Sequence, residues 1–505
     1  MKKITIIFLL SFLSIVLFSC KELTTTSTNQ TTTEQLTTTT ILTTKPWTYQ
    51  PENENLSYSE RVSLYNNQYN IGLFVTEDLT TSIGINFEMP TEGKAFVEYK
   101  VQGDNEILTK EATYKSTLIG KKTAHHFELV LSELSPDTVY EYRVKNEFND
   151  VISEVYQFKT KSINPDSFSF LFLADPQENS TLGYMAYSHV LLNVLDEVNQ
   201  KPDFMMFAGD IVNDADIRSE WNNFFTYSSP FIFNTPIAAT SGNHDIAGIS
   251  GTRMSNLEFD GYFNLPNNGP VYTPFDEIEN DVRPANFDDG KTYSFNYDNT
   301  HFVAINTETL CDGTTTCSLN DTTNVELLKT WLINDLSNHS MKWTIVFMHR
   351  GAYSLSYNTY KVREELVPIF ESHGVDLVIS GHDHQYSRSV YNSGNLIGFN
   401  RSDTYSLGTL SLLPSSETDF HFNDYSSQVG VTYLVGNTVG TKYYGGEKNS
   451  GIGVHYAFLD SNPVVPYIVV TESSIEVISY GLAKSSELQI EVDGIYILES
   501  FKISK

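Results

Sequence analysis

The stretch Val375-Asp-Leu-Val-Ile-Ser-Gly-His-Asp-His384 joins a short apolar run directly to two histidines. Its length and its Val, Leu and Ile residues are typical of a buried β-strand. Side chains at the carboxyl ends of strands in an open α/β sheet converge on one crevice, where ligands bind. The stretch therefore predicts an α/β domain with imidazole ligands at one edge of a sheet.

Four further apolar runs end at a polar residue of metal-ligand type. They run from residue 170 to Asp175, from 204 to Asp210, from 236 to Asn243-His244-Asp245, and from 343 to His349. One such ending would carry little weight, because an Asp or His after a strand is more often a turn former or a helix cap. The run 302–305 ends at Asn306 without any such element, so these endings are not automatic in this chain. Together they predict a site for divalent metal ions.

Periodicity around these runs indicates the same class of fold. Residues 184–198 carry apolar side chains on one helical face, and residues 362–373 repeat the pattern before Gly374. Residues 463–503 alternate like strands but are too few for a secure core of their own. We expect them to pair with the sheets of the α/β domain.

The preceding part of the chain has a different pattern. Between about residues 63 and 161, runs of alternating apolar and polar residues are separated by turn-rich breaks, which predicts a small all-β sandwich. The stretch 134–144 resembles the strand entry of fibronectin type III domains. In that arrangement the hydroxyl of Tyr140 bonds back to the preceding turn.

The order Asp, Gly-Asp, Gly-Asn-His-Asp, His and Gly-His-x-His resembles that of the calcineurin-like metallophosphoesterases. The flanking all-β region and residues 375–386 make the chain most similar to the purple acid phosphatase branch. This resemblance covers roughly residue 63 to the C-terminus. It implies an α/β fold, a four-layer α/β/β/α metallophosphoesterase sandwich, preceded by an all-β fibronectin III-like sandwich.

The resemblance also implies a role for each strand-end residue. Asp175 and His384 would hold a first metal ion, and Asp210 would bridge the pair. The second ion would be held by Asn243, His349 and His382. His244 would face the phosphate and protonate the leaving oxygen, so the expected catalytic residues are His244, Asp210 and His349, and the expected substrate contacts are Asn243, His244 and Arg350.

Three positions leave alternatives open. Asn213 stands where purple acid phosphatases have a tyrosine three residues after the bridging Asp, so we expect no purple chromophore and ferric iron becomes less certain. Gln177 stands where many metallophosphoesterases have a histidine ligand, and it either coordinates weakly through oxygen or orients a water. Arg350 either binds a substrate phosphate bidentately or caps its strand through an ion pair. We expect Asp245 and Asp383 to accept hydrogen bonds from the imidazoles of the site.

The chemistry explains the choice of residue types. Hydrolysis of phosphate monoesters needs accelerations of up to ~10^21-fold, whereas one general acid supplies only ~10^2 to 10^4. Two metal ions about 3.5 to 4 Å apart lower the pKa of a bridging water, orient it and neutralise phosphoryl charge. We expect two divalent or trivalent ions as cofactors, with Fe, Zn and Mn as the candidates.

The N-terminus has the pattern of a targeting segment. Lys2 and Lys3 precede an apolar run that ends at Ser19-Cys20, which resembles a bacterial lipobox, and a plain signal peptide is the alternative. The predicted organisation is a lipoprotein-type signal peptide at residues 1–20, a Thr-rich tether at 21–60, the all-β sandwich at 61–163 and the metallophosphoesterase domain at 164–505. The predicted location is outside the cytoplasm, as a membrane lipoprotein or a secreted protein.

Charge and cysteine content restrict the partners. The net charge of -30 argues against binding to nucleic-acid backbones or anionic lipid surfaces. We expect a phosphorylated small molecule as substrate and membrane contact only through a lipid at Cys20. Cys311 and Cys317 are predicted to form a local disulfide, with a metal-binding pair as the less favoured alternative.

These observations allow more than one function. The leading hypothesis is a phosphomonoesterase similar to acid phosphatases, and a phosphodiesterase acting on nucleotides or lipid head groups is the alternative. The loops at residues 246–291 and 387–432 would decide between them. A non-catalytic surface receptor or adhesin is the alternative from another class.

Overall fold

The computed structural model describes most of the chain after its N-terminal segment. The described residues are 47, 67–119, 122–148, 150–246, 257–272, 291–311, 322–357, 359–393, 395–396, 422–426, 430–444, 456–458, 461–484 and 492–505. Residues 45–505 form one compact unit. The predicted signal peptide, its Cys20 and, apart from Trp47, the tether lie outside the described residues, as do Cys317 and most of both predicted specificity loops.

Among the described residues, the largest sheet has eleven strands. In order across the sheet they are β18 (Phe422–Ser426), β23 (Val492–Ser504), β22 (Ser474–Lys484), β21 (Val464–Thr471), β9 (Ser167–Leu173), β10 (Phe204–Ala208), β11 (Ile237–Thr240), β1 (Gly72–Phe74), β2 (Ile83–Met89), β6 (Lys122–Leu131) and β5 (Thr113–Ile119). Strands β9, β10 and β11 are parallel neighbours, so their carboxyl ends lie at one edge. Strand β21 pairs with β9, and β22 and β23 continue the sheet beyond it, which confirms that the last residues pair with a sheet of this domain.

A second sheet has eight strands. They are β12 (Tyr293–Tyr297), β13 (Thr300–Ile305), β14 (Trp343–Arg350), β15 (Leu377–Gly381), β19 (Val431–Gly436), β16 (Tyr386–Asn392), β17 (Asn395–Leu396) and β20 (Tyr456–Phe458), the last pairing with β16. Strands β13, β14, β15 and β19 are parallel in register. Between Met348 and Arg350 the pairing of β14 with β15 shifts register, so His349 lies at a bulge. Bulges of this kind re-aim a side chain.

The two sheets pack face to face. In β13, Phe302 and Ala304 join the core that also contains residues of β9, β10 and β11. The alternate residues Val303 and Ile305 join a second core on the other face of the sheet. This alternation follows from the period of two along a strand, and it buries the second sheet on both faces.

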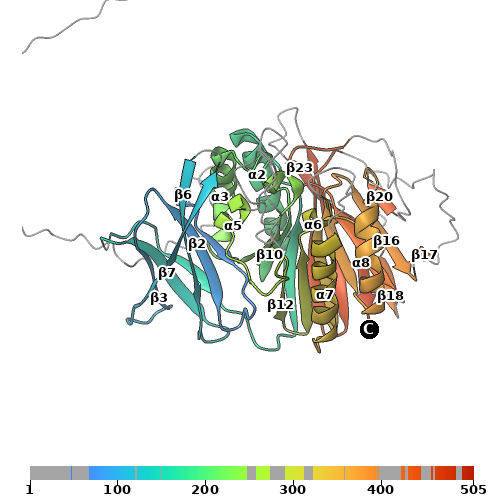
Figure 1. The fold of residues 1–505 in the computed structure, drawn as a ribbon, viewed down its shortest axis with the longest axis horizontal. Coiled ribbons are helices and arrows are strands. Elements are labelled where there is room, and N and C mark those ends of the chain that lie inside the picture. Colours follow the sequence, from blue (N-terminus) through green and yellow to red (C-terminus); the bar gives the residue numbers. More distant parts are fainter. Residues whose placement is uncertain are drawn as a thin grey trace, which may run out of the picture. The chain divides into compact units, whose positions relative to one another are not determined.

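Helices cover the outer faces of both sheets. The helices in the described part of the chain are α2 (Thr181–Val198), α3 (Arg218–Ile232), α4 (Asn243–Ile246), α5 (Leu257–Tyr262), α6 (Glu308–Cys311), α7 (Thr322–Ser337) and α8 (Tyr360–Ser372). Buried residues of α2 and α3 belong to the core around the first sheet, and those of α7 and α8 to the second core. Figure 1 shows α7 and α8 side by side. The layers are therefore helix, sheet, sheet, helix, as the resemblance implied.

Local signals explain where α2 begins and where both predicted helices end. Ser180 caps α2, because its hydroxyl accepts a hydrogen bond of 3.1 Å from the amide of Gly183. Asn199 ends the helix with a left-handed φ of 48°. Gly374, with φ of 69°, follows α8 in the same way.

The N-terminal β region is divided between two sheets. A four-stranded sheet contains β4 (Leu108–Glu111), β3 (Ala95–Val101), β7 (Val139–Asn146) and β8 (Tyr156–Lys159). The other strands of this region extend the largest sheet, because β1 pairs with β11 at Phe74 and Ile237. The amide of Ser135 donates a 2.9 Å hydrogen bond to the hydroxyl of Tyr140, as the sequence predicts. The proposed domain boundaries stay a prediction.

Among the described residues, no helix is both long and apolar enough to cross a membrane.

Candidate metal centre

Five strand ends from the two facing sheets place the predicted ligands together. Asp175 follows β9, Asp210 follows β10, and Asn243 begins the short helix after β11. From the second sheet, His349 lies near the end of β14 and His382 follows β15. The ring nitrogen Nδ1 of His349 donates a 2.8 Å hydrogen bond to the carbonyl of Ala208 in β10, which ties the two edges together.

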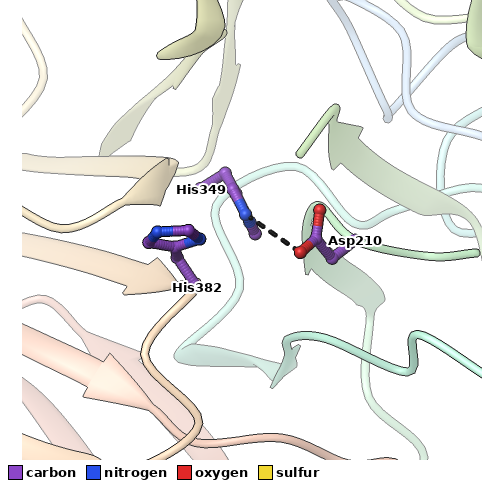
Figure 2. Close-up of side chains that lie close together, drawn as sticks. All are labelled: Asp210, His349 and His382. Carbon is purple, nitrogen blue, oxygen red and sulfur yellow. Dashed lines mark ion pairs between the residues drawn. The ribbon is translucent and has the colours of Figure 1, made fainter. Parts of the chain in front are cut away.

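The predicted ligands form two overlapping groups. Asp210, His349 and His382 have ligand atoms that all lie within 4.8 Å of one another. Figure 2 shows these three side chains with their ends turned toward a common space. Asp175, Asp210 and His384 form a second group under the same limit. Asp210 belongs to both groups, as a carboxylate that bridges two metal ions must.

Direct contacts connect these side chains. The Nε2 atom of His349 lies 3.3 Å from Oδ2 of Asp210 and 3.1 Å from Oδ1 of Asn243. The Nε2 atom of His384 lies 3.4 Å from Oδ1 of Asp175. All six predicted core ligands are thus brought together, although their individual roles stay predictions.

Unpartnered buried atoms test whether the cluster suits metal ions. Within the described part of the chain, Nε2 of His384 and both side-chain polar atoms of Gln177 are buried without a hydrogen-bond partner. The other ring nitrogen of His384 donates to the carbonyl of Lys442, so Nε2 keeps a free lone pair. Buried polar atoms are normally paired. Carboxylate oxygens and imidazole nitrogens with open lone pairs, held from behind by backbone carbonyls, fit two metal ions.

The backbone is strained at the ligand positions. Asp175, Asp210 and His382 have φ values of 50°, 50° and 67°, in the left-handed region that non-glycine residues rarely adopt. Gln177 has a φ of 40°. Such conformations cost on the order of 1–3 kcal/mol each and cluster at functional sites. These four residues follow the ends of three strands, β9, β10 and β15.

Glycines before the ligands permit the close approach of the strand ends. A Cβ atom at Gly381 would lie 2.6 Å from Oδ2 of Asp175, and one at Gly242 would lie 2.8 Å from Cε1 of His349. Real Cβ atoms do not approach so closely. This explains in physical terms why Gly precedes the Asn-His and His-Asp-His elements.

Charge coupling within the cluster is strong. Burial alone would raise the pKa of Asp210, but the imidazoles of His349 and His244 hold it well below its usual range. Burial alone would lower the pKa of His349, but the carboxylates of Asp210 and Asp175 raise it to about 9. Burial and the neighbouring Arg350 lower the pKa of His382.

His244 lies at the rim of the cluster. Its amide donates a 2.8 Å hydrogen bond to Oδ1 of Asp210, and its Nδ1 donates one of 2.6 Å to the carbonyl of Asn213. The amide of Asn213 in turn donates to Glu220 over 2.9 Å. The side chain is half-buried, and Nε2 is the ring atom left to face a substrate.

Arg350 is held by a carboxylate that the sequence did not reveal. Its Nε lies 2.5 Å from Oε1 of Glu308 and its second terminal nitrogen 3.0 Å from Oε2. Its remaining terminal nitrogen lies 3.2 Å from Nε2 of His382. The side chain is 1% exposed. These contacts match the ion-pair alternative, and a contact with phosphate stays a prediction.

The expectation for Asp245 and Asp383 was wrong about their partners. Asp245 accepts hydrogen bonds of 2.8 Å from the amides of Ile211 and Gly242. Asp383 accepts bonds from the amides of residues 355 and 356, at 2.5 and 2.9 Å. Both carboxylates therefore hold loops in place rather than imidazoles. Burial and the nearby Asp210 raise the pKa of Asp245 to about 8.

Two tyrosines beside the cluster were missed by sequence reasoning. The ring of Tyr357 lies 4.5 Å from that of His382, and the ring of Tyr444 lies 4.4 Å from that of His384, between centroids. The chain has 30 tyrosines, and neither of these two follows a patterned strand. Their spacing in the sequence carried no signal that could have selected them.

Comparison with known proteins gives two family matches. Residues 168–386 match the calcineurin-like phosphoesterase family, and residues 68–160 match the purple acid phosphatase N-terminal domain. The first match includes all six predicted core ligands.

Individual relatives are distant. The relative called probable inactive purple acid phosphatase 1, of Arabidopsis thaliana, is 23% identical over 354 residues, which cover 63% of this chain and 54% of that protein. Purple acid phosphatase 15 of the same plant is 22% identical over 302 residues, which cover 53% and 50%. This chain thus spans about half the length of these two curated relatives.

A solved structure shows the same fold. Purple acid phosphatase PPD1 from yellow lupin (Lupinus luteus) seeds superimposes with a TM-score of 0.60 at 15% identity, over 86% of this chain and 74% of that one. The predicted fold class, an α/β domain preceded by an all-β region, is confirmed. The chain therefore carries a calcineurin-like phosphoesterase domain, preceded in the sequence by a purple acid phosphatase N-terminal domain.

Proposed function

We propose that this chain is a metal-dependent phosphoester hydrolase that acts on phosphomonoesters outside the cytoplasm. The observation that carries the proposal is the sharing of Asp210 between two buried ligand groups. A carboxylate in that position suits a centre of two ions, and the candidates are Fe, Zn and Mn. The family match at residues 168–386 supports the reaction class.

Each residue has a proposed task. Asp175 and His384 would hold one ion, Asn243, His349 and His382 the other, and Asp210 both. When bound, the ions supply Lewis acidity for the phosphoryl group and activation of the attacking water.

His244 would hold the proton for the leaving oxygen on Nε2, because Nδ1 is occupied by the carbonyl of Asn213. Asn243 would contact the substrate at the same rim. Gln177 would lend its unpartnered amide oxygen to the first ion or to a water beside it.

The non-catalytic alternative is disfavoured by the residues themselves. A degenerate enzyme is expected to have lost a ligand or the proton donor, yet all six core ligands and His244 are present. Localisation is part of the proposal: residues 1–20 would direct export, Cys20 would carry a lipid, and the Thr-rich segment would act as the tether.

The test is elemental analysis of the chain without residues 1–44, combined with hydrolysis of a chromogenic phosphomonoester and a chromogenic phosphodiester. We expect about two metal ions per chain and faster turnover of the monoester. His349→Ala and Asp210→Asn should abolish turnover. His125→Ala, a histidine of the distant strand β6, is the matched control and should leave turnover at the wild-type rate.

The other outcomes assign the alternatives. Faster turnover of the diester would favour the phosphodiesterase. Absence of bound metal and of turnover, across several added divalent ions, would reject the hydrolase and favour the surface receptor.

A further inference from the structure

A pair of tyrosines forms a wall beside the metal-ligand histidines. Tyr357 lies 4.5 Å from His382 at an angle of 36°, and Tyr444 is stacked on His384 at 4.4 Å and 15°, between ring centroids. The two tyrosine rings meet edge to face with centroids 5.7 Å apart. Both side chains are half-buried, so each ring is packed on the centre and still reaches solvent.

The segment that carries the histidine ligands also holds this wall in place. Asp383 accepts hydrogen bonds from the amides of Leu355 and Ser356, two and one residues before Tyr357. Gln385 accepts one of 3.0 Å from the hydroxyl of Ser356. Its amide nitrogen donates one of 2.9 Å to the backbone carbonyl of Tyr444.

Alternation along the segment explains this arrangement. His382 and His384 turn toward the metal centre, and the residues between and after them turn toward the two loops. The imidazole of His384 adds a further tie, because its Nδ1 donates to the carbonyl of Lys442. Both tyrosines are therefore fixed relative to the ligands before any substrate arrives, which is what precise positioning requires.

The charges of the site show why neutral donors are needed here. The guanidinium of Arg350, the cation expected to contact a phosphate, donates hydrogen bonds to both carboxylate oxygens of Glu308. The charge on the several oxygens of a phosphoryl group is stabilised by hydrogen-bond donors as well as by metal ions. A phenol carries its proton at neutral pH and donates one hydrogen bond. The side chains of Tyr357 and Tyr444 hydrogen-bond to one another, so binding of a phosphoryl group by both hydroxyls would replace this mutual bond.

We propose that Tyr357 and Tyr444 are substrate-binding residues whose phenol hydroxyls donate hydrogen bonds to the phosphoryl oxygens. The inference rests on the proposed function, since it assigns recognition of the phosphate at the same centre. The tyrosines bind the group common to all phosphomonoesters and to inorganic phosphate. They would act on binding and leave proton transfer by His244 unchanged.

The test uses the full chain purified in detergent with Tyr357→Phe, Tyr444→Phe and Tyr353→Phe. The Phe variants keep the rings and remove only the hydroxyls. We expect the first two to raise KM for a phosphomonoester and the inhibition constant of inorganic phosphate by about tenfold to a hundredfold, the range for a hydrogen bond to a charged group. Metal content and kcat should change much less.

Tyr353 is the matched control from the same loop. Its ring stacks on Tyr391 with centroids 3.7 Å apart, within the core on the helix side of the second sheet. Tyr353→Phe should leave KM and the inhibition constant at wild-type values.

Binding of inorganic phosphate to the metal-loaded chain, measured by calorimetry, separates the two proposals. Unchanged phosphate affinity in both Phe variants would overturn the tyrosine assignment. Loss of metal from those variants would overturn it too, because the tyrosines would then act by holding His382 and His384. A wild type that binds phosphate through these hydroxyls but hydrolyses nothing would leave the assignment standing and reject the hydrolase.

Discussion

Two buried histidines have ring nitrogens without a hydrogen-bond partner, and their surroundings separate a proposed metal ligand from a core residue. Within the described residues, Nε2 of His384 and both ring nitrogens of His126 have no partner. The free nitrogen of His384 lies 3.4 Å from a carboxylate oxygen of Asp175. The ring of His126 lies against Tyr262, with centroids 4.7 Å apart at 77°. An open lone pair beside a carboxylate attracts a cation, whereas one beside an aromatic ring does not.

The charges around the two histidines differ in the same way. At the metal centre the carboxylates of Asp175 and Asp210 face imidazoles. Around His126, which connects the N-terminal strands to the α/β part, the charged groups satisfy one another: Lys115 pairs with Asp260, and Arg218 with Glu88. Burial and a missing partner therefore do not identify a ligand by themselves. The sign of the neighbouring charge does.

The largest expected effect sharpens this comparison directly. His384→Ala should remove metal from the chain and lower kcat/KM by at least about a thousandfold, because loss of a mere supporting contact already costs 10- to 100-fold in such sites. His126→Leu should leave both quantities near wild type. Elemental analysis and steady-state kinetics on the two variants provide the measurement.

Equal metal loss in both variants would mean that His126 acts on the centre through the fold. Full metal content in His384→Ala would remove this residue from the ligand set.

The second effect extends the comparison from imidazoles to a buried cation. Glu308→Gln leaves the guanidinium of Arg350 buried without its carboxylate, which should lower the free energy of unfolding by about 3–5 kcal/mol. Glu326→Gln is the matched control, because Glu326 pairs with Lys329 at the surface and is 65% exposed. Its expected cost is below about 1 kcal/mol. Urea unfolding of both variants gives the two values.

A different result would favour the alternative role of Arg350, binding of a substrate phosphate. If Glu308→Gln keeps the stability of the wild type but changes phosphate affinity, the arginine has turned from the carboxylate to the substrate.

The clustering of the candidate metal ligands was largely predictable, because the sequence signal for each of them is local. Each of Asp175, Asp210, Asn243, His349 and His382 follows or ends an apolar run, and the parallel sheet order brings such ends together. The end of the second predicted helix before Gly374 was a local signal too, whereas the first helix begins at Thr181 and not at the predicted residue 184. The neighbouring side chains and backbone groups that each of these residues contacts could not be predicted from the sequence.

Contacts between residues that are far apart in the sequence have no recognisable sequence pattern. Glu308 reaches Arg350 across 42 residues, and Tyr444 lies 60 positions after His384 in the sequence. The pairing of Phe74 with Ile237, which merges the N-terminal strands with the largest sheet, depends on tertiary packing alone. Asp245 was misassigned because its backbone partners cannot be recognised from a residue type.

The smallest effect concerns His126 and acid. Burial, with the nearby Lys115 and His125, lowers the pKa of His126 from 6.5 to about 3. The unfolded chain therefore takes up a proton below about pH 6.5 that the folded chain does not bind, so this residue's contribution to stability is complete above that pH and is lost as the pH falls toward 3.

Near pH 4.5 the loss of stability should be about 3 kcal/mol, since each pH unit corresponds to about 1.4 kcal/mol. His126→Leu cannot take up the proton, so its free energy of unfolding should fall less between pH 7 and pH 4.5 than that of the wild type. Parallel pH profiles for wild type and His126→Leu would show that the imidazole finds a hydrogen-bond acceptor when it is protonated, and the contrast with His384 would then rest on the carboxylate alone.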